Sequence, residues 1–246
     1  MIEARDITKR YGDVLAVDHV SFRAEAGDVV GFLGPNGAGK TTTMRILTGF
    51  LPATDGTAQI DGHDIFDDPL AARRSVGYLP EFPPLYPEMD VSGYLHYVAK
   101  IKDVPRKQRR AAVDRAMQRC GLTEVRRRVI GALSKGFRQR VGIAQAIVHD
   151  PPVLILDEPT IGLDPIQIRE IRALIADLAA PRAGARGHTI VLSTHILAEV
   201  EAICRRVIII SQGRKVVDTP LTELTRDGTR LEDVFARAAL REEAAA

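Results

Sequence analysis

A glycine-rich segment of the chain contains one lysine and two threonines at spacings that suit phosphate binding. Residues 34–41 have the sequence GPNGAGKT, and Thr42 follows. This order fits the pattern G-x-x-x-x-G-K-[ST], in which backbone N–H groups of a tight turn surround an anion. Lys40 is expected to reach the β- and γ-phosphates, the Thr41 hydroxyl to hold Mg²⁺, and Thr42 to bond the α-phosphate. The predicted nucleotide-binding residues of this loop are Gly34, Pro35, Asn36, Gly37, Ala38, Gly39, Lys40, Thr41 and Thr42.

The elements on either side of this loop are those that the pattern requires. Val29–Leu33 is an apolar run typical of a strand, and Lys40–Leu47 is predicted to be a helix. The helix would add unpaired N–H groups and the positive end of its dipole to the phosphate site. The segment therefore predicts binding of a nucleoside triphosphate.

Two adjacent carboxylates follow another apolar run, in VLILDEPT, residues 153–160. Asp157 leaves the carboxyl end of the predicted strand, where ligands of open α/β sheets bind. It is expected to hold Mg²⁺ through water. Glu158 points in a different direction and is predicted to polarise the attacking water.

A second anion site is predicted in LSKGFRQR, residues 133–140. Ser134 and Gly136 precede an expected helix start, so a hydroxyl and N–H groups converge with a positive dipole end. If this segment projects sideways from the phosphate loop, one chain cannot use both sites on one nucleotide. A second copy that faces it can.

The remaining pattern predicts an α/β fold with a mostly parallel core sheet. Apolar runs without polar alternation are typical of strands buried on both faces, and they alternate here with helical segments. In the first thirty residues, apolar and polar side chains alternate. This pattern predicts a small antiparallel β subdomain, which also includes GTAQIDG, residues 56–62. Between residues 89 and 149 the pattern is helical, as in an inserted subdomain. The predicted core strands are Val29–Leu33, Val76–Leu79, Val153–Leu156, Thr189–Leu192 and Val207–Ile210.

Composition excludes some alternatives. The net charge of +2 over 246 residues gives no case for nucleic acid as a partner, and the short cluster RKQRR at Arg106–Arg110 is interpreted as a solvated helix face. No apolar run approaches the ~20 residues that cross a bilayer, and the N-terminus lacks the apolar core of a signal peptide. The two cysteines, Cys120 and Cys204, are expected to be free thiols.

Taken together, the motifs resemble those of ATP-binding cassette (ABC) transporter nucleotide-binding subunits over essentially the whole chain. GPNGAGKT, LSKGF, LDEPT, IGLDP and STH occur in the family's order and spacing. The resemblance implies a head-to-tail dimer in which two ATPs lie between the phosphate loop of one subunit and the LSKGF motif of the other. It also implies that Tyr11 stacks on adenine, that Asp164 contacts the partner subunit, and that His195 lies near the γ-phosphate.

The chain departs from the family pattern at two places. Glu81 stands where the family has glutamine, and a carboxylate can bind Mg²⁺ but cannot donate a hydrogen bond as an amide does. Lys135 and Phe137 replace glycine and glutamine of the commoner LSGGQ, while Ser134 and Gly136 remain. We therefore expect hydrolysis to persist, with Glu158, His195, Lys40 and Glu81 as catalytic residues, Thr41, Asp157 and Glu81 as metal ligands, and ATP and Mg²⁺ as cofactors.

The resemblance extends to the type-two branch of exporters, through GYLPEFPPLYPEMDVSGYL and LEDVF. We expect Phe82–Pro87, an apolar segment stiffened by prolines, to receive a helix of a separate transmembrane permease subunit. The second nucleotide-binding subunit is expected to be another copy of the chain. The complex would lie at the cytoplasmic face of the inner membrane, with this chain peripheral to it.

The whole chain, residues 1–246, is predicted to be one ABC ATPase domain. Residues 1–88 and 150–225 would form the nucleotide-binding core with its antiparallel subdomain, 89–149 the helical subdomain, and 226–246 a C-terminal helix and tail. The predicted function is ATP-driven export through a membrane subunit. The alternatives are a soluble ABC ATPase of DNA repair or translation, which usually has a coiled-coil insertion or two tandem cassettes, and a module that ATP clamps without hydrolysis.

Overall fold

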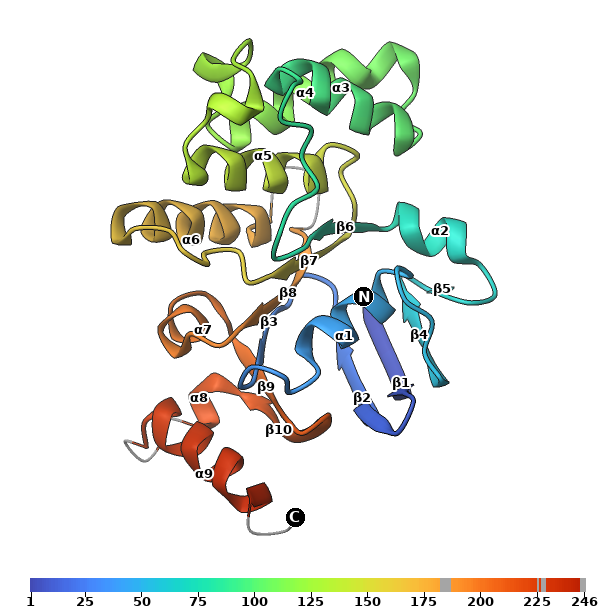
Figure 1. The fold of residues 1–246 in the computed structure, drawn as a ribbon, viewed down its shortest axis with the longest axis vertical. Helices are drawn as coiled ribbons and strands as arrows, with labels where there is room; N and C mark the ends of the chain where they lie inside the picture. The colour runs from blue at the N-terminus through green and yellow to red at the C-terminus, as the bar shows by residue number, and fades with distance from the viewer. Residues whose placement is uncertain (182–186, 225, 227–228, 244–246) are drawn as a thin grey trace.

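A six-stranded sheet forms the centre of the molecule (Figure 1). The computed structural model describes residues 1–181, 187–224, 226 and 229–243. The strand order is β10-β9-β3-β8-β7-β6; all neighbours are parallel except the edge strand β10, which pairs antiparallel with β9. The strands are β3 (Val29–Leu33), β6 (Val76–Leu79), β7 (Val153–Asp157), β8 (Thr189–Thr194), β9 (Arg206–Ser211) and β10 (Arg214–Pro220).

The purely apolar strands bury both of their faces. Val30 and Ile155 point into one hydrophobic cluster, whereas Leu33 and Leu156 point into the other. Because successive side chains of a strand alternate between faces, a strand covered on both sides has a nearly continuous apolar sequence. Each such side chain stabilises the fold by about 1.5–3 kcal/mol relative to its exposed state.

A smaller antiparallel sheet is formed by the N-terminal part of the chain, in the order β2-β1-β4-β5. Its strands are β1 (Ile2–Tyr11), β2 (Val14–Ala24), β4 (Asp55–Ile60) and β5 (His63–Asp64). The helix α1 (Lys40–Leu47) lies between the two sheets, and its Met44, Ile46 and Leu47 join the cluster that contains Ile2 and Ile155. This packing fixes the start of α1 at the carboxyl end of β3.

Three helices, α3 (Val91–Ile101), α4 (Arg106–Arg119) and α5 (Lys135–Ile147), gather at one end of the molecule (Figure 1). Short 3₁₀ turns at Thr123–Val125 and Ile130–Ala132 connect α4 to α5. The helix α5 begins at Lys135, so Gly136 lies in its first turn, whereas the sequence predicted that Gly136 would precede the helix.

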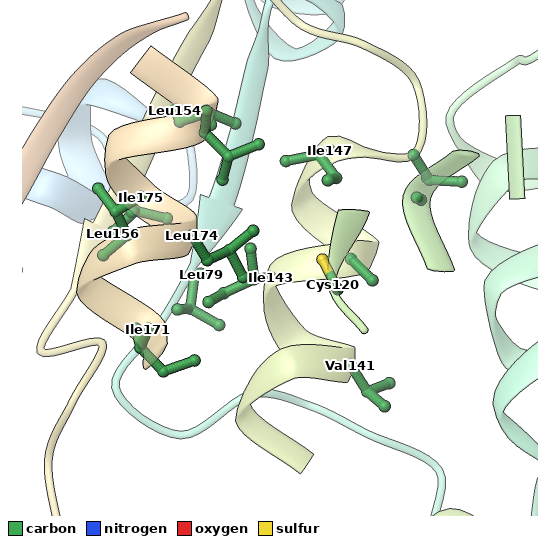
Figure 2. Close-up of a cluster of buried hydrophobic side chains, with 14 of the residues drawn as sticks. Leu79, Cys120, Val141, Ile143, Ile147, Leu154, Leu156, Ile171, Leu174 and Ile175 are labelled. Carbon is green, nitrogen blue, oxygen red and sulfur yellow. The ribbon is translucent and has the colours of Figure 1, made fainter. Parts of the chain in front are cut away.

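The helix α5 packs against β6, β7 and α6 (Pro165–Ala179) through a continuous aliphatic core (Figure 2). Gly77 on β6 permits this approach, because a Cβ there would collide with the carbonyl oxygen of Ala146. On the surface, Arg140 of α5 donates a hydrogen bond to Glu170 of α6 at 2.8 Å. The side chains of this core include Leu79, Ile143, Ile147, Leu154, Leu156, Ile171, Leu174 and Ile175.

The remaining helices are α2 (Pro69–Arg74), α7 (Leu197–Ile203), α8 (Leu221–Leu224) and α9 (Leu231–Glu243). The helix α9 lies at the end of the molecule opposite α3 and α4 (Figure 1). Part of the predicted C-terminal region, residues 227–228 and 244–246, lies outside the described residues. Within the described residues, no helix has the length and apolar character needed to cross a membrane. The fold class predicted from the sequence is confirmed.

Candidate functional site

The glycine-rich loop turns between β3 and α1 with its backbone in conformations that favour glycine. Gly37 and Gly39 have φ of 81° and 96°. A Cβ at Gly39 would collide with the carbonyl oxygen of Ala16 on β2, whereas one at Gly37 would meet nothing within 4 Å. The uncapped N-terminus of α1 follows, with Gly39 at the cap position and no side-chain cap. The loop therefore presents free N–H groups to an anion.

Lys40 is held across this loop by backbone carbonyl groups. Its Nζ donates to the carbonyl oxygens of Gly34 at 2.8 Å and Pro35 at 3.1 Å, and it lies 3.9 Å from Glu158 Oε1. Burial lowers the pKa of Lys40, and the charges of Glu158, Asp157 and Glu81 oppose this shift. A phosphate group that enters the loop would supply the opposite charge that favours the ammonium form.

Asp157 ends β7 and is completely buried. Neither of its carboxylate oxygens has a hydrogen-bond partner among the described residues. Burial raises the pKa of this carboxyl group, while the nearby hydroxyls of Ser193 and Thr41 act in the opposite direction. A buried carboxylate without a partner is costly unless a cation binds it, and Mg²⁺ prefers oxygen ligands of this kind.

The other predicted metal ligands lie nearby but do not form a closed metal site. Thr41 and Glu81 line one cavity together with Glu158. In the described part of the chain no group of three or more histidine, cysteine, aspartate and glutamate side chains could hold a metal ion by itself. The donors present, one hydroxyl and two carboxylates, fit an ion that takes its remaining ligands from water and nucleotide oxygens.

Glu158 and His195 are paired at the carboxyl ends of two neighbouring strands. Nδ1 of His195 lies 2.8 Å from Glu158 Oε1. Glu158 is buried and has a φ of 50°, so its backbone leaves the strand direction that Asp157 still follows. Its N–H donates to the carbonyl oxygen of Ser193 at 2.8 Å, which holds this turn against β8. The imidazole of His195 is 41% exposed, whereas the Glu158 side chain is 7% exposed.

One cavity of about 480 Å³ brings many of the predicted residues together. It lies over the glycine-rich loop, between the ends of β3 and β7 and the residue after β8. Ala16 and Ile161 line it as well, and neither was predicted to be a site residue. Its predicted lining residues are Asn36, Gly37, Gly39, Lys40, Thr41, Thr42, Glu81, Glu158 and His195.

Eight predicted site residues do not line this cavity: the buried Asp157, the loop residues Gly34, Pro35 and Ala38, and Tyr11, Ser134, Gly136 and Asp164. Tyr11 ends β1 and is 47% exposed, and Lys9 Nζ lies 5.3 Å from the centre of its ring. Ser134 caps α5, where its Oγ accepts a hydrogen bond from the N–H of Phe137 at 3.3 Å, and Gly136 follows in the first turn. Asp164 caps α6 by accepting from the N–H groups of Ile166 and Gln167, each at 2.9 Å.

Three polar residues behind the cavity were not predicted: Ser193, Thr194 and Glu199. All are buried. Strand β8 runs to Thr194, two residues beyond the prediction, because its last side chains are polar yet enclosed. The polar run before His195 was the available signal for Ser193 and Thr194, whereas nothing in the sequence distinguished Glu199 from an exposed helical glutamate.

A phosphate-binding loop between a parallel strand and a helix, with an Asp–Glu pair at the end of β7, which β8 separates from β3 in the same sheet, defines a nucleoside triphosphatase of the α/β class. Comparison with known proteins narrows this class. A model of the family described as "ABC transporter" matches residues 17–161. The chain belongs to this family.

The chain is similar to curated transporter subunits. It is 40% identical to the bacitracin transport ATP-binding protein BcrA of Bacillus licheniformis, over 92% of this chain and 72% of that protein. It is 37% identical to the Nod factor export ATP-binding protein I of Burkholderia orbicola (strain AU 1054), over 88% of this chain and 70% of that protein.

Solved structures give the same result. An ATP-binding subunit of an ABC transporter superposes with a TM-score of 0.84 and 29% identity, over 97% of this chain and 99% of the other. The dimeric cassette MJ0796 in a post-hydrolysis state with ADP and Pi superposes with a TM-score of 0.78 and 25% identity, over 90% and 99%. The prediction of an ATP-binding and ATP-hydrolysing subunit of an ABC transporter is confirmed.

Proposed function

We propose that this chain hydrolyses ATP in a head-to-tail dimer and thereby drives export by a separate membrane subunit. The observation that carries the proposal is the convergence of Lys40, Glu158, His195 and the glycine-rich loop on one cavity. Export is favoured because the relatives named above include a Nod factor export protein and a bacitracin transport protein. The substrate would be selected by the membrane subunit.

Within the site, the residues have distinct roles. The loop N–H groups and Lys40 bind and neutralise the phosphates, and Thr41, Asp157 and Glu81 would hold Mg²⁺. That ion would neutralise charge on the β- and γ-phosphates. Glu158 orients and polarises the attacking water, while His195, which is hydrogen-bonded to it, faces the γ-phosphate position. Tyr11, at the end of β1, stacks on the adenine.

A second copy completes the site. Ser134 and Gly136 begin α5 and lie outside the cavity that holds Lys40. A partner in the opposite orientation would bring its Ser134 to the γ-phosphate and its Asp164 to the interface. ATP favours closure because it contacts both copies, and hydrolysis removes that bridge, so the dimer opens again.

The groove beside Glu81 supports docking of a membrane subunit. Phe82, Pro83, Leu85, Pro87 and Ile130 line a hollow of about 370 Å³, and Phe82 is 78% exposed. Glu81 lines both this groove and the nucleotide cavity. A permease helix in the groove would therefore sense nucleotide through Glu81. The chain would then lie at the cytoplasmic face of the inner membrane.

We also propose that residues 1–246 act as a single ABC ATPase domain with the three parts expected from the sequence. Residues 1–88 and 150–225 contribute both sheets and the nucleotide cavity, residues 89–149 contribute the α3–α5 group, and residues 226–246 contain α9. The shared core between α5 and α6 supports movement of this group as a body attached to the nucleotide-binding part.

Glu158→Gln tests the catalytic assignment. The variant is expected to bind ATP as the parent does, to lose at least 100-fold in hydrolysis, and to accumulate an ATP-dependent dimer in light scattering. Glu124→Gln, an exposed matched change on a 3₁₀ turn, should leave all three unchanged. Hydrolysis by Glu158→Gln at the parent rate would remove Glu158 from its role.

A further inference from the structure

Behind the Glu158–His195 pair lies a second buried carboxylate, that of Glu199, in the first turn of α7. Glu199 is 1% exposed. Its Oε2 accepts a hydrogen bond from the Thr194 hydroxyl at 2.7 Å, and its Oε1 has no hydrogen-bond partner among the described residues. Burial raises the pKa of Glu199, while the Thr194 hydroxyl and the charge of Arg172 act in the opposite direction.

Thr194 stands between the two glutamates. Its Oγ1 lies 2.7 Å from Glu199 Oε2 and 3.5 Å from Glu158 Oε2, and it accepts a hydrogen bond from the N–H of Ile196 at 3.1 Å. A threonine hydroxyl has a single proton, so it can donate to only one carboxylate at a time. The two distances assign that proton to Glu199.

Among the described residues, this assignment leaves Glu158 Oε2 without a strong donor, while its Oε1 contacts His195. We propose that Glu199 is a positioning residue for hydrolysis: it holds the Thr194 proton, so that the Glu158 carboxylate stays directed toward His195 and the nucleotide cavity. Without Glu199, the Thr194 hydroxyl turns to Glu158 Oε2 and draws that carboxylate back toward β8. The inference rests on the proposed role of Glu158.

A purely structural role makes a different prediction. Glu199 lies at the third position of α7, where a glutamate often caps the helix. Here the N–H of Ile196 bonds Thr194 rather than Glu199. If Glu199 only holds Thr194 in place to cap α7, removing Thr194 as well should lower ATP hydrolysis further rather than restore it.

The test is a double-mutant cycle in the 246-residue chain, with ATP hydrolysis measured at saturating and limiting ATP. Glu199→Met is expected to lower kcat about tenfold with KM within twofold. Glu199→Gln keeps an acceptor for Thr194 and should stay within about threefold of the parent kcat. Glu201→Gln, an exposed change on the same helix, should be indistinguishable from the parent. These fold-changes follow from losing or keeping one hydrogen bond of about 1.4 kcal/mol.

The decisive variant is Thr194→Val combined with Glu199→Met. It should hydrolyse ATP faster than Glu199→Met alone, because the competing donor is gone. A double variant as slow as the single, or slower, would overturn the proposal in favour of a capping role. If Glu199→Met does not fold, as judged by thermal unfolding, Glu199→Ala replaces it in the cycle.

Two variants distinguish the positioning role of Glu199 from the catalytic role of Glu158. An active Glu158→Gln would remove the proposed role of Glu158 itself. An inactive Glu158→Gln together with a fully active Glu199→Met would overturn only the positioning role.

Discussion

Nδ1 of His195 lies 2.8 Å from Oε1 of Glu158, although 37 positions separate the two residues. The parallel pairing of β7 with β8 brings them together, because Asp157 lies opposite Ser193 in the register. Each residue then follows its strand at the same edge of the sheet, where the cavity opens. The pair is therefore a product of register as well as of residue type.

His195→Ala should separate binding from hydrolysis. The imidazole is 41% exposed, so its loss leaves folding intact, but it removes the group that holds Glu158 Oε1. We expect ATP affinity within about threefold of the parent and a kcat about 100-fold lower. Parallel titration with ATP and steady-state assays measure both. His63→Ala, a half-exposed histidine on β5, is the matched control, and an equal loss in the two variants would contradict the assignment.

Gly39→Ala and Gly37→Ala form a matched pair within one loop. Both positions have positive φ, so each alanine costs about 1–2 kcal/mol of backbone strain. At Gly39 the added Cβ also collides with the Ala16 carbonyl oxygen of β2, whereas at Gly37 the space is open.

Gly39→Ala should therefore weaken ATP binding at least tenfold more than Gly37→Ala does. Calorimetric titration measures the affinities, and thermal unfolding separates loss of binding from loss of fold. Equal affinities in the two variants would mean that the loop does not need the backbone approach at Gly39.

The parts of the fold that the sequence predicted best are those where burial and chemical type agree. Val29–Leu33 and Val76–Leu79 are entirely or mostly apolar, and both are strands with the predicted bounds. The edge strand β10 was missed because all of its residues are exposed or half-buried and its sequence, RKVVDTP, mixes charges with valines. Its pairing with β9 depends on the neighbouring strand, which a local pattern does not contain.

The site residues likewise divide into those that a local motif predicts and those that depend on tertiary contacts. Lys40, Thr41 and Asp157 follow from motifs whose spacing is fixed by one strand–loop–helix unit. Glu199 could not be found in this way, because its burial comes from a contact between the start of α7 and the end of β8. Which oxygen of Glu158 faces Thr194 and which faces His195 is likewise a result of packing, and one-dimensional spacing does not encode it.

His149 should make the protein sensitive to acid. Its Nε2 lies 3.2 Å from the carbonyl oxygen of Val76, and burial, with a smaller contribution from Lys102 and His188, lowers its pKa from 6.5 to about 3. Because the folded-state pKa is below the unfolded one, this stability is present above pH 6.5 and is lost as the pH falls toward 3.

His149→Gln should reduce the slope of unfolding free energy against pH in that window, by up to about 1.4 kcal/mol per pH unit. Urea unfolding at a series of pH values measures the slope. His63→Gln serves as the control on an unrelated surface. A His149→Gln slope equal to that of the parent would mean that His149 is protonated in the folded protein.

Cys120 and Cys204 should be inert in the folded protein. Their side chains are 0% and 6% exposed, and burial raises the pKa of each thiol from 9.0 to about 12. The thiolate is the reactive form. At pH 8 these thiols are therefore protonated, and their burial also keeps an alkylating reagent from reaching them. After unfolding, both thiols regain ordinary acidity and react.

Labelling with iodoacetamide at pH 8, followed by mass spectrometry, should therefore give no adduct in the native protein and two adducts in denaturant. Ala111→Cys provides the positive control, because residue 111 is exposed on α4 and its thiol should be modified in the folded state. The same shift predicts that stability falls as the pH rises from 9 toward 12, since only the unfolded chain gains thiolates in that range. Native modification of Cys120 or Cys204 at the rate seen for Ala111→Cys would mean that α4 or α7 opens readily. The aliphatic core between α5 and α6 would then not be the rigid support that the nucleotide site requires.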